Sequence, residues 1–193
     1  MTHLLGLTGS IGMGKSTTAQ MFRDAGVPVW DADETVHKLY EVGGAAVAPI
    51  RALFPQAILN GAVSRAALKE VIAEDLGALA QIEAIVHPLV TDMRARFLAQ
   101  SDAPLIVCDI PLLFETNADR WLDSVLVVSA PPDVQRARVL SRDDMTAEQF
   151  EFILSRQMAD ADKQARADHL IETNDIAATR QAVTDLIAKL THA

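Results

Sequence analysis

The chain has 193 residues, of which 50% are hydrophobic, and this is enough for one globular domain with a substantial core. Its 17 basic and 26 acidic residues give a net charge of −9, which argues against general nucleic-acid binding, because phosphate contacts require a cationic surface. The single cysteine, Cys108, excludes an internal disulfide and fits a reducing compartment.

Short apolar runs alternate along the chain with longer segments of helical pattern. The runs typical of buried strands lie at residues 4–7, 27–30, 105–110, 125–130 and 169–172. The helical patterns cover residues 15–25, most of 34–100, and then 132–141, 146–166 and 176–191. Strands that alternate with helices predict a three-layer α/β fold, in which a five-stranded parallel sheet has helices on both faces.

The interval from residue 34 to residue 100 is far longer than one crossover between strands needs, and it contains no convincing strand. We interpret it as a helical insertion beside the sheet and not as a separate domain. No repeat, low-complexity tract or linker rich in proline and serine divides the chain. The sequence therefore predicts a single domain.

No segment predicts export or insertion into a membrane. The start, MTHLLGLTG, lacks the basic segment and the long apolar segment of a signal peptide. The most apolar run, at residues 105–114, is broken by Asp109 and Pro111 and is too short to cross a bilayer. We therefore expect a cytoplasmic protein with no membrane partner and no nucleic-acid partner.

A glycine-rich loop follows the first predicted strand. Residues 9–16, GSIGMGKS, match the phosphate-binding pattern G-x-x-x-x-G-K-[ST] between a strand and a helix, which is the context in which the pattern is informative. Gly9 and Gly14 can adopt backbone angles that other residues resist, and the amides at the helix start then point at a phosphate. Lys15 would bridge the β- and γ-phosphates, and the Ser16 hydroxyl would bind Mg²⁺. The alternative is a chance glycine-rich turn with a surface lysine.

The loop and the start of its helix supply most of the expected nucleotide contacts. The candidate ATP-binding residues here are Gly12, Met13, Gly14, Lys15, Ser16 and Thr17, the last through the α-phosphate. Such a loop identifies a nucleotide and not a reaction, because switches, motors and kinases all use it.

Carboxylates follow two of the predicted strands, at the edge of the sheet where ligands bind. Asp31 and Asp33 come after the second strand, and either could orient an alcohol and accept its proton, or cap the next helix. Asp109 closes the third strand and could hold Mg²⁺ directly or through water, or belong to the turn before Pro111.

Basic residues are concentrated after the fourth strand, at positions 136, 138, 142, 156, 163 and 166. Together they could clamp the transferring phosphates, although each one singly is more typical of a solvated helix. Arg138 and Arg142 are four residues apart and are expected to share one helical face, and Arg142 is our candidate for closing over the phosphates. Residues 143–146 predict a mobile tip, with Thr146 as a helix cap.

With these motifs in place, the sequence resembles the dephospho-CoA kinase family over nearly its whole length. The similar segments are GLTGSIGMGKST, VPVWDADETVH, IEAIVHPLV, VCDIPLLFE, APPDVQRARVLSRD, RQM and ARADHLIETN, in this order. The loop alone is shared by many kinases, whereas the combination is specific. Two departures from the family pattern are Ser10, where glycine is common, and Met13, which would place a larger side chain beside the phosphates.

The resemblance implies a P-loop kinase-like fold and transfer of the ATP γ-phosphoryl group to the ribose 3′-hydroxyl of dephospho-CoA. It implies that Asp33 is the general base, that Lys15 and Ser16 with Mg²⁺ hold the triphosphate, and that Arg142 closes over the phosphates. The implied acceptor-binding residues are Asp33, Arg65 and His87, and Asn174 would lie near the adenine of ATP.

The same resemblance divides the domain into three parts. The core is formed by residues 1–33, 101–135 and 167–193, the helical acceptor-binding insertion by 34–100, and a helical lid by 136–166. His87 could instead mark a helix boundary, because the following Pro88 disfavours helix at the preceding residue.

Two other functions fit the loop less well. One is a different small kinase, for a nucleoside monophosphate or a sugar. The other is a nucleotide-dependent switch, but a GTPase would carry an Asn/Thr-Lys-x-Asp segment, and the sequence has none. The expected partners are ATP and dephospho-CoA, and we expect a monomer or a weak homo-oligomer.

Overall fold

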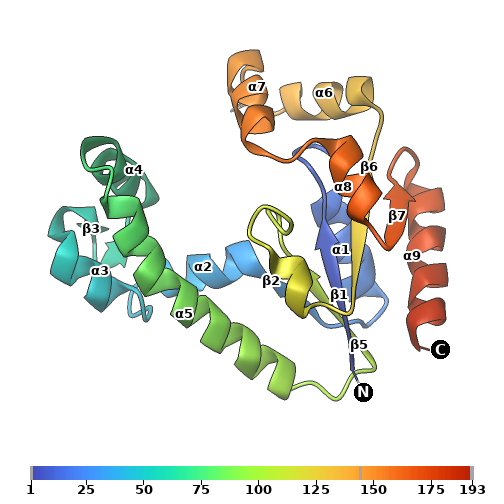
Figure 1. The fold of residues 1–193 in the computed structure, drawn as a ribbon, viewed down its shortest axis with the longest axis horizontal. Coiled ribbons are helices and arrows are strands. Elements are labelled where there is room, and N and C mark those ends of the chain that lie inside the picture. Colours follow the sequence, from blue (N-terminus) through green and yellow to red (C-terminus); the bar gives the residue numbers. More distant parts are fainter. Residues whose placement is uncertain (1, 144, 192–193) are drawn as a thin grey trace. The chain divides into compact units, whose positions relative to one another are not determined.

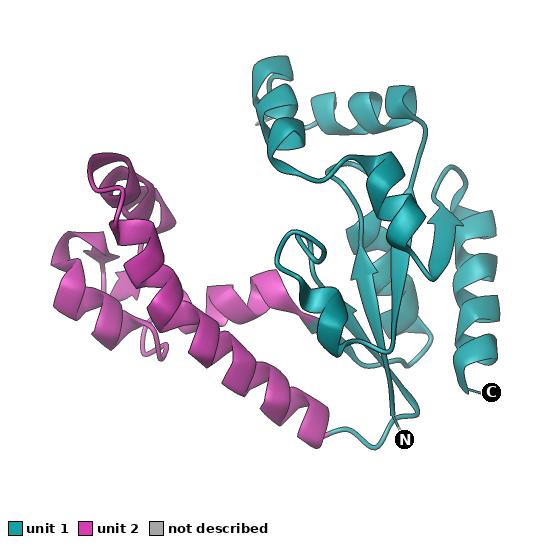
Figure 2. Ribbon diagram, in the orientation of Figure 1, with its two compact units in different colours: residues 1–30, 101–193 teal, residues 31–100 magenta. Residues whose placement is uncertain are grey.

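The computed structural model describes residues 2–143 and 145–191 (Figure 1). The chain divides into two compact units, which are coloured separately in Figure 2. We call residues 1–30 and 101–193 the sheet unit, and residues 31–100 the helical unit.

The sheet unit is built on a five-stranded parallel sheet, as the sequence predicts. Its strands are β1 (His3–Thr8), β2 (Val29–Asp31), β5 (Leu105–Asp109), β6 (Ser124–Ser129) and β7 (His169–Glu172), in the order β2-β5-β1-β6-β7. In the register, Leu5 is the partner of both Val107 and Ser124. The second strand begins at Val29 instead of residue 27. Pro28 has no N–H to donate to the neighbouring strand, which explains the later start. Its carbonyl still accepts a hydrogen bond from Val107 N–H at 2.9 Å.

The helices of the sheet unit follow the predicted order, with one exception. They are α1 (Lys15–Asp24), η2 (Ala118–Trp121), α6 (Pro132–Leu140), α7 (Ala147–Arg156), α8 (Asp160–Arg166) and α9 (Ile176–Thr191). The prediction of a single helix over 146–166 is wrong, because Gln157 and Ala159 both have extended ψ angles, of 150° and 143°. Thr146 caps α7 in a capping box, as expected, whereas Asp144 of the predicted tip lies outside the described residues.

Alternation along the strands places two sets of side chains on the two faces of the sheet. Leu5 and Leu7 of β1 belong to a buried cluster with Phe22 of α1 and Val183 of α9. Gly6 points to the other face, where an added Cβ would lie 2.5 Å from Leu122 Cδ1. Cys108 is buried, as predicted.

The helical unit has a core of its own. Its elements are α2 (Ala32–Tyr40), α3 (Val47–Leu53), η1 (Pro55–Ala57), β3 (Ile58–Leu59), β4 (Ala62–Val63), α4 (Arg65–Glu74) and α5 (Ala78–Ala99). Buried residues from several of these helices form one cluster, among them Leu39, Ile50, Leu68 and Ile82.

Two predictions for the helical unit are wrong. The segment does contain strands, because β3 and β4 form an antiparallel hairpin around Asn60 and Gly61, whose φ angles are 51° and 84°. These positive angles are what an Asn-Gly turn provides. Pro88 also does not end a helix: α5 runs through it. Pro88 has no N–H to donate to the carbonyl of Ala84, four residues earlier in the helix. Both residues are exposed, so water can reach the carbonyl that lacks its helical donor.

Candidate active site

The glycine-rich loop links β1 to α1 and leaves the start of that helix open. Gly12 and Gly14 have φ angles of 79° and 85°, the left-handed region that favours glycine. Gly14 is the residue before α1, and it makes no side-chain cap. The amides of the first helical turn, at Lys15, Ser16 and Thr17, therefore keep the donor capacity that suits an anion.

Gly9 has a different role from the one expected. Its φ is not in the positive range, so backbone strain does not explain it. Instead, an added Cβ would lie 2.7 Å from Val128 Cγ2 and 2.8 Å from the Val128 carbonyl. Glycine is needed here because the loop passes directly against β6.

Lys15 and Asp109, two residues predicted to act at the nucleotide, are in contact. Lys15 Nζ donates to Asp109 Oδ1 at 2.6 Å, and the two side chains are 17% and 3% exposed. Ser16 and Thr17 are exposed on the first turn of α1. The loop lysine and the carboxylate at the end of β5 thus meet at the carboxyl edge of the sheet, where parallel sheets bind their ligands.

The Met13 side chain is buried in the core of the sheet unit. It is 2% exposed and belongs to the core cluster, and its sulfur accepts from Ala130 N–H at 3.1 Å. The thioether thus fills space beneath the loop, which leaves the backbone of Met13 as the part available to a nucleotide.

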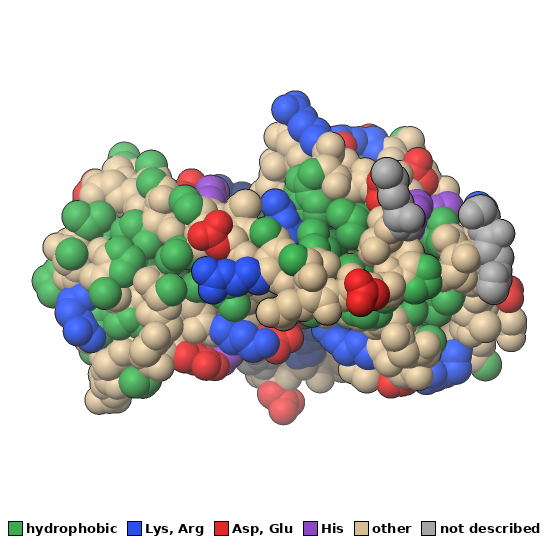
Figure 3. Space-filling view, turned by 90° about the horizontal axis from the view of Figure 1, so that it is seen from below, with side chains coloured by type: hydrophobic (Ala, Val, Ile, Leu, Met, Phe, Trp, Pro, Cys, Tyr) green, Lys and Arg blue, Asp and Glu red, His purple; other side chains and the backbone are tan. Residues whose placement is uncertain are grey.

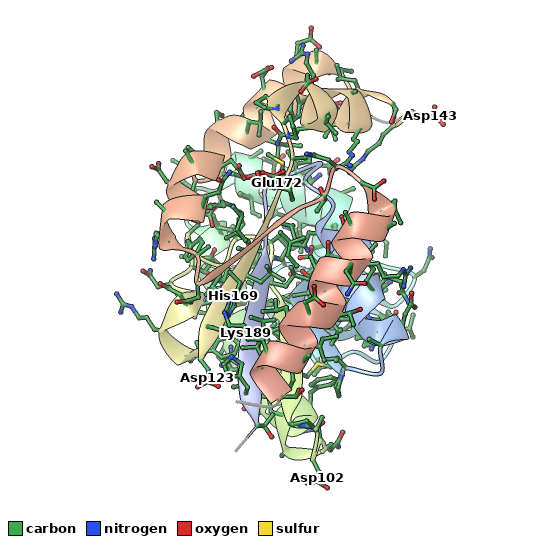
Figure 4. All side chains as sticks on the ribbon, turned by 90° about the vertical axis from the view of Figure 1, so that its right-hand side faces the viewer. Asp102, Asp123, Asp143, His169, Glu172 and Lys189 are labelled. Atoms are coloured by element: carbon green, nitrogen blue, oxygen red, sulfur yellow. The ribbon has the colours of Figure 1, made fainter. Side chains whose placement is uncertain are left out.

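Thr173, just after β7, joins the loop to the sheet. Its hydroxyl donates to the Met13 carbonyl at 2.9 Å, and its N–H donates to the Ser129 carbonyl at 2.9 Å. Arg138 of α6 donates to the Thr173 hydroxyl at 3.0 Å and to its carbonyl at 2.5 Å. The next residue, Asn174, is exposed. It follows the carboxyl end of β7, where Figure 4 labels Glu172.

The basic residues after β6 differ in their surroundings. The prediction that Arg138 and Arg142 share a helical face is wrong, because α6 ends at Leu140 and Arg142 lies in the following turn, exposed. Three other cations are paired with carboxylates of the protein: Arg136 with Glu151 at 2.7 Å, Lys163 with Glu115 at 3.1 Å, and Arg166 with Asp119 at 2.8 Å.

The Lys163–Glu115 pair is buried beneath α8. The Lys163 side chain is 0% exposed, and the Glu115 carboxylate also accepts from Met158 N–H at 2.8 Å. Burial acts to raise the pKa of Glu115, but the backbone N–H groups of Met158 and Glu115 and the Lys163 ammonium outweigh it, so the pKa is lowered. This pair holds the start of α8 against the segment that follows β5.

The candidate acceptor-binding residues all belong to the helical unit. Asp31 caps α2, since its Oδ1 accepts from Glu34 N–H at 2.9 Å, which settles which member of the aspartate pair is the cap. Asp33 is exposed in the first turn of α2. The Arg65 guanidinium lies 5.9 Å from the centre of the Tyr40 ring, and His87 is exposed on α5.

Comparison with known proteins decides which kinase family these features belong to. A family model described as dephospho-CoA kinase matches residues 3–178. The chain belongs to the dephospho-CoA kinase family. A dephospho-CoA kinase from a Jannaschia species is 59% identical to it over 192 residues, which are 99% of this chain and 98% of the relative.

Solved structures agree with the α/β fold expected for this family. A protein from Thermus thermophilus is 32% identical, with a TM-score of 0.88 and 98% of each chain covered. The dephospho-CoA kinase from Campylobacter jejuni is 23% identical, with a TM-score of 0.72, covering 100% of this chain and 98% of its own. At that identity the second likeness shows the fold alone.

Three residues of this family member were not found from the sequence. Besides Thr173, they are Gln135, whose Nε2 donates to the Ile11 carbonyl at 2.7 Å, and Gln157, whose Oε1 accepts from Ile11 N–H at 3.1 Å. Gln135 is 6% exposed and lies four residues before the buried Val139 on α6. A polar residue in the apolar stripe of a helix was the signal that could have revealed it.

A pocket of about 440 Å³ lies away from this edge, between β7 and α9, and is lined by His169, Asp185 and Lys189 among others. Figure 4 shows His169 and Glu172 toward opposite ends of β7. Burial lowers the pKa of His169, and the Lys189 ammonium lowers it further. The pocket is at the amino ends of the strands, so it is not the nucleotide site.

No helix in residues 2–143 or 145–191 is long and apolar enough to span a membrane. Over the same ranges, no three His, Cys, Asp or Glu residues are grouped as metal ligands. On the face drawn in Figure 3, lysine and arginine side chains are dispersed among acidic and hydrophobic ones.

Proposed function

We propose that this protein is an ATP-dependent dephospho-CoA kinase, which phosphorylates the ribose 3′-hydroxyl of dephospho-CoA in the last step of coenzyme A synthesis. The observation that carries the proposal is the family match over residues 3–178, together with a glycine-rich loop whose lysine meets a strand-end carboxylate. Phosphoryl transfer needs positioning and charge stabilisation more than covalent chemistry, and these residue types supply both.

The proposed nucleotide site is made from the sheet unit. The backbone of Gly12, Met13 and Gly14 and the helix start from Lys15 to Thr17 would cradle the triphosphate. Arg142, exposed beyond α6, would close over the phosphates as part of the proposed lid (residues 136–166), and Asn174 would lie near the adenine.

The proposed metal ligands fit Mg²⁺ chemically. Ser16 offers a hydroxyl and Asp109 a carboxylate, and Mg²⁺ is commonly held by one or two such oxygens together with substrate phosphates and water. The lack of a group of three ligands in the described residues is compatible with this mode of binding. When bound, Mg²⁺ would neutralise charge on the phosphates.

The proposed acceptor site uses the exposed Asp33 as general base, with Arg65 and His87 as further contacts. Asp31 is occupied as a helix cap, which favours Asp33 for the catalytic role. The monomeric or weakly oligomeric state and the location in the cytoplasm stay predictions from the sequence.

The direct test is to incubate the purified protein with ATP, Mg²⁺ and dephospho-CoA and to identify the product by mass and by the position of the new phosphate. We expect coenzyme A and ADP in equal amounts. AMP and shikimate serve as alternative acceptors. Phosphorylation of one of these, without formation of coenzyme A, would overturn the proposal.

Asp33→Asn tests the proposed base. Removing the proton acceptor should lower kcat by about 10²- to 10⁴-fold. ATP affinity should stay nearly unchanged, because an exposed carboxylate of α2 has no proposed contact with the nucleotide. Glu34→Gln, which removes one charge from the same helical turn, is the matched control. Wild-type turnover in Asp33→Asn would remove this residue from the mechanism.

A further inference from the structure

The N–H and the C=O of Ile11, which belong to the peptide groups before and after this residue, are each bound by a glutamine side chain, one from the segment proposed as the lid and one from the helix that leads into it. We propose that Gln135 and Gln157 are positioning residues, which clamp the backbone on both sides of Ile11 so that the loop stays ready to bind a nucleotide. The inference rests on one part of the proposed function, namely that the glycine-rich loop binds a nucleotide.

The chemistry of the two contacts is complementary. Gln157 Oε1 accepts from Ile11 N–H at 3.1 Å, and Gln135 Nε2 donates to the Ile11 carbonyl at 2.7 Å. A primary amide can do either, so the backbone group that each glutamine meets, the N–H or the carbonyl of Ile11, determines which end of the side chain faces the loop. Both polar groups of Ile11 are thereby satisfied by side chains far away in the sequence, 146 and 124 residues distant.

The two glutamines are themselves held in place. Gln135 is 6% exposed, and an added Cβ on Gly12 would lie 3.0 Å from the Gln135 carbonyl and 2.5 Å from Val139 Cγ2, so α6 packs directly against the loop. Gln157 precedes Met158, whose N–H donates to Glu115 at 2.8 Å. Glu115 is the partner of the buried Lys163. The contact of Gln157 with the loop is thus anchored to α8.

This arrangement has a consequence for affinity. Ile11 directly precedes Gly12, whose positive φ helps to turn the loop. A loop free to rotate about the backbone of Ile11 would populate other conformations, and the apparent affinity for a nucleotide falls in proportion to the competent fraction. Neither glutamine needs to touch the nucleotide for this effect.

The test uses Gln135→Met and Gln157→Met, which keep side-chain length and remove the hydrogen bonds. ADP binding is measured by calorimetry without an acceptor, and the KM values for ATP and dephospho-CoA are measured separately. Each variant should weaken ADP binding and raise the KM for ATP by about three- to tenfold, the usual range for one hydrogen bond, with little change in the KM for dephospho-CoA. Gln181→Met on α9, which loses only a bond to Asp185, is the matched control.

The double variant distinguishes a clamp from two separate contacts. If the two bonds act together to fix the backbone angles of Ile11, loss of either one frees this residue, so the double variant should bind ADP about as well as the weaker single variant. Losses that multiply, or single variants that bind ADP like the wild type, would overturn the proposal. Lower thermal stability with unchanged ADP binding would also overturn it, because the role would then be structural.

Hydrogen exchange of the wild type keeps the proposal testable if the variants do not fold. The Ile11 amide should exchange slowly in the protein without nucleotide, and exchange at the rate of an open loop would contradict the clamp. If the wild type binds ADP but makes no coenzyme A, the proposed function fails. The role of the glutamines is still decided by the ratio of the ADP affinity of each variant to that of the wild type.

Discussion

Two lysine–carboxylate pairs of the sheet unit differ in which partner is buried. In the glycine-rich loop, Lys15 is 17% exposed and its partner Asp109 is 3% exposed. Beneath α8 the order is reversed, since Lys163 is 0% exposed and Glu115 is 19% exposed. The first ammonium is partly exposed, so in the proposed nucleotide site it could exchange its carboxylate for a phosphate, whereas the second ammonium is fully buried.

This difference indicates what each pair does for the protein. Burying two charges gains little stability over an apolar pair, but removing one partner leaves the other uncompensated. A pair whose ammonium is partly exposed therefore suits a ligand site for anions, and a pair whose ammonium is fully buried suits an anchor. Variants of the two lysines should separate catalysis from stability.

Among the variants that compare the two lysine–carboxylate pairs, Lys15→Ala should have the largest effect. Without the ammonium, the charge that develops on the phosphates in the transition state is less stabilised, so kcat/KM for ATP should fall by about 10²- to 10³-fold. Steady-state kinetics with several acceptors measure this, and circular dichroism checks that the variant is folded. Unchanged ATP kinetics would contradict the assignment of the loop.

The second effect, on stability, is expected from Lys163→Met. The Glu115 carboxylate would lose its buried partner, and the free energy of unfolding should fall by about 3 kcal/mol in urea titrations. Turnover of the folded variant at saturating ATP should stay within about threefold of the wild type.

Lys38→Met is the control for that variant, because it breaks an exposed pair with Glu34 at 2.7 Å. It should change stability by no more than about 0.5 kcal/mol. Equal losses of unfolding free energy in Lys163→Met and Lys38→Met would show that burial of the lysine does not determine what an ion pair contributes to stability.

The smallest effect concerns pH. The pKa of Glu115 is lowered from the value of 4.5 that applies without these partners, so its contribution to stability is complete above pH 4.5 and is lost as pH falls through the lowered pKa. Glu115→Gln lacks this contribution at every pH. The difference in unfolding free energy between wild type and variant should therefore shrink below pH 4.5. A constant difference down to pH 3 would contradict the shift.

Local patterns predicted much of the fold and the loop. The five strands are runs of apolar residues bounded by turn residues, and the loop motif carries its own backbone geometry at Gly12 and Gly14. The hairpin at Asn60 and Gly61 was predictable in principle, but strands of two residues give no periodic signal.

Contacts between distant segments could not be read in this way. The bonds from Gln135 and Gln157 to Ile11 join a side chain to a backbone group, and a backbone group has no sequence signature. The end of α6 at Leu140 lies within one residue of the end expected from the pattern at residues 132–141. The expectation that Arg142 shares the face of Arg138 failed because it extended the helix beyond that end.

The support that Thr173 gives to Met13 bears on the order in which the site is completed during synthesis. The motif emerges from the ribosome first, whereas the hydroxyl that holds the Met13 carbonyl is added about 160 residues later. A nascent chain would thus carry every residue of the motif well before it could shape them into a finished nucleotide cradle, and only the residue that follows the last strand would complete it.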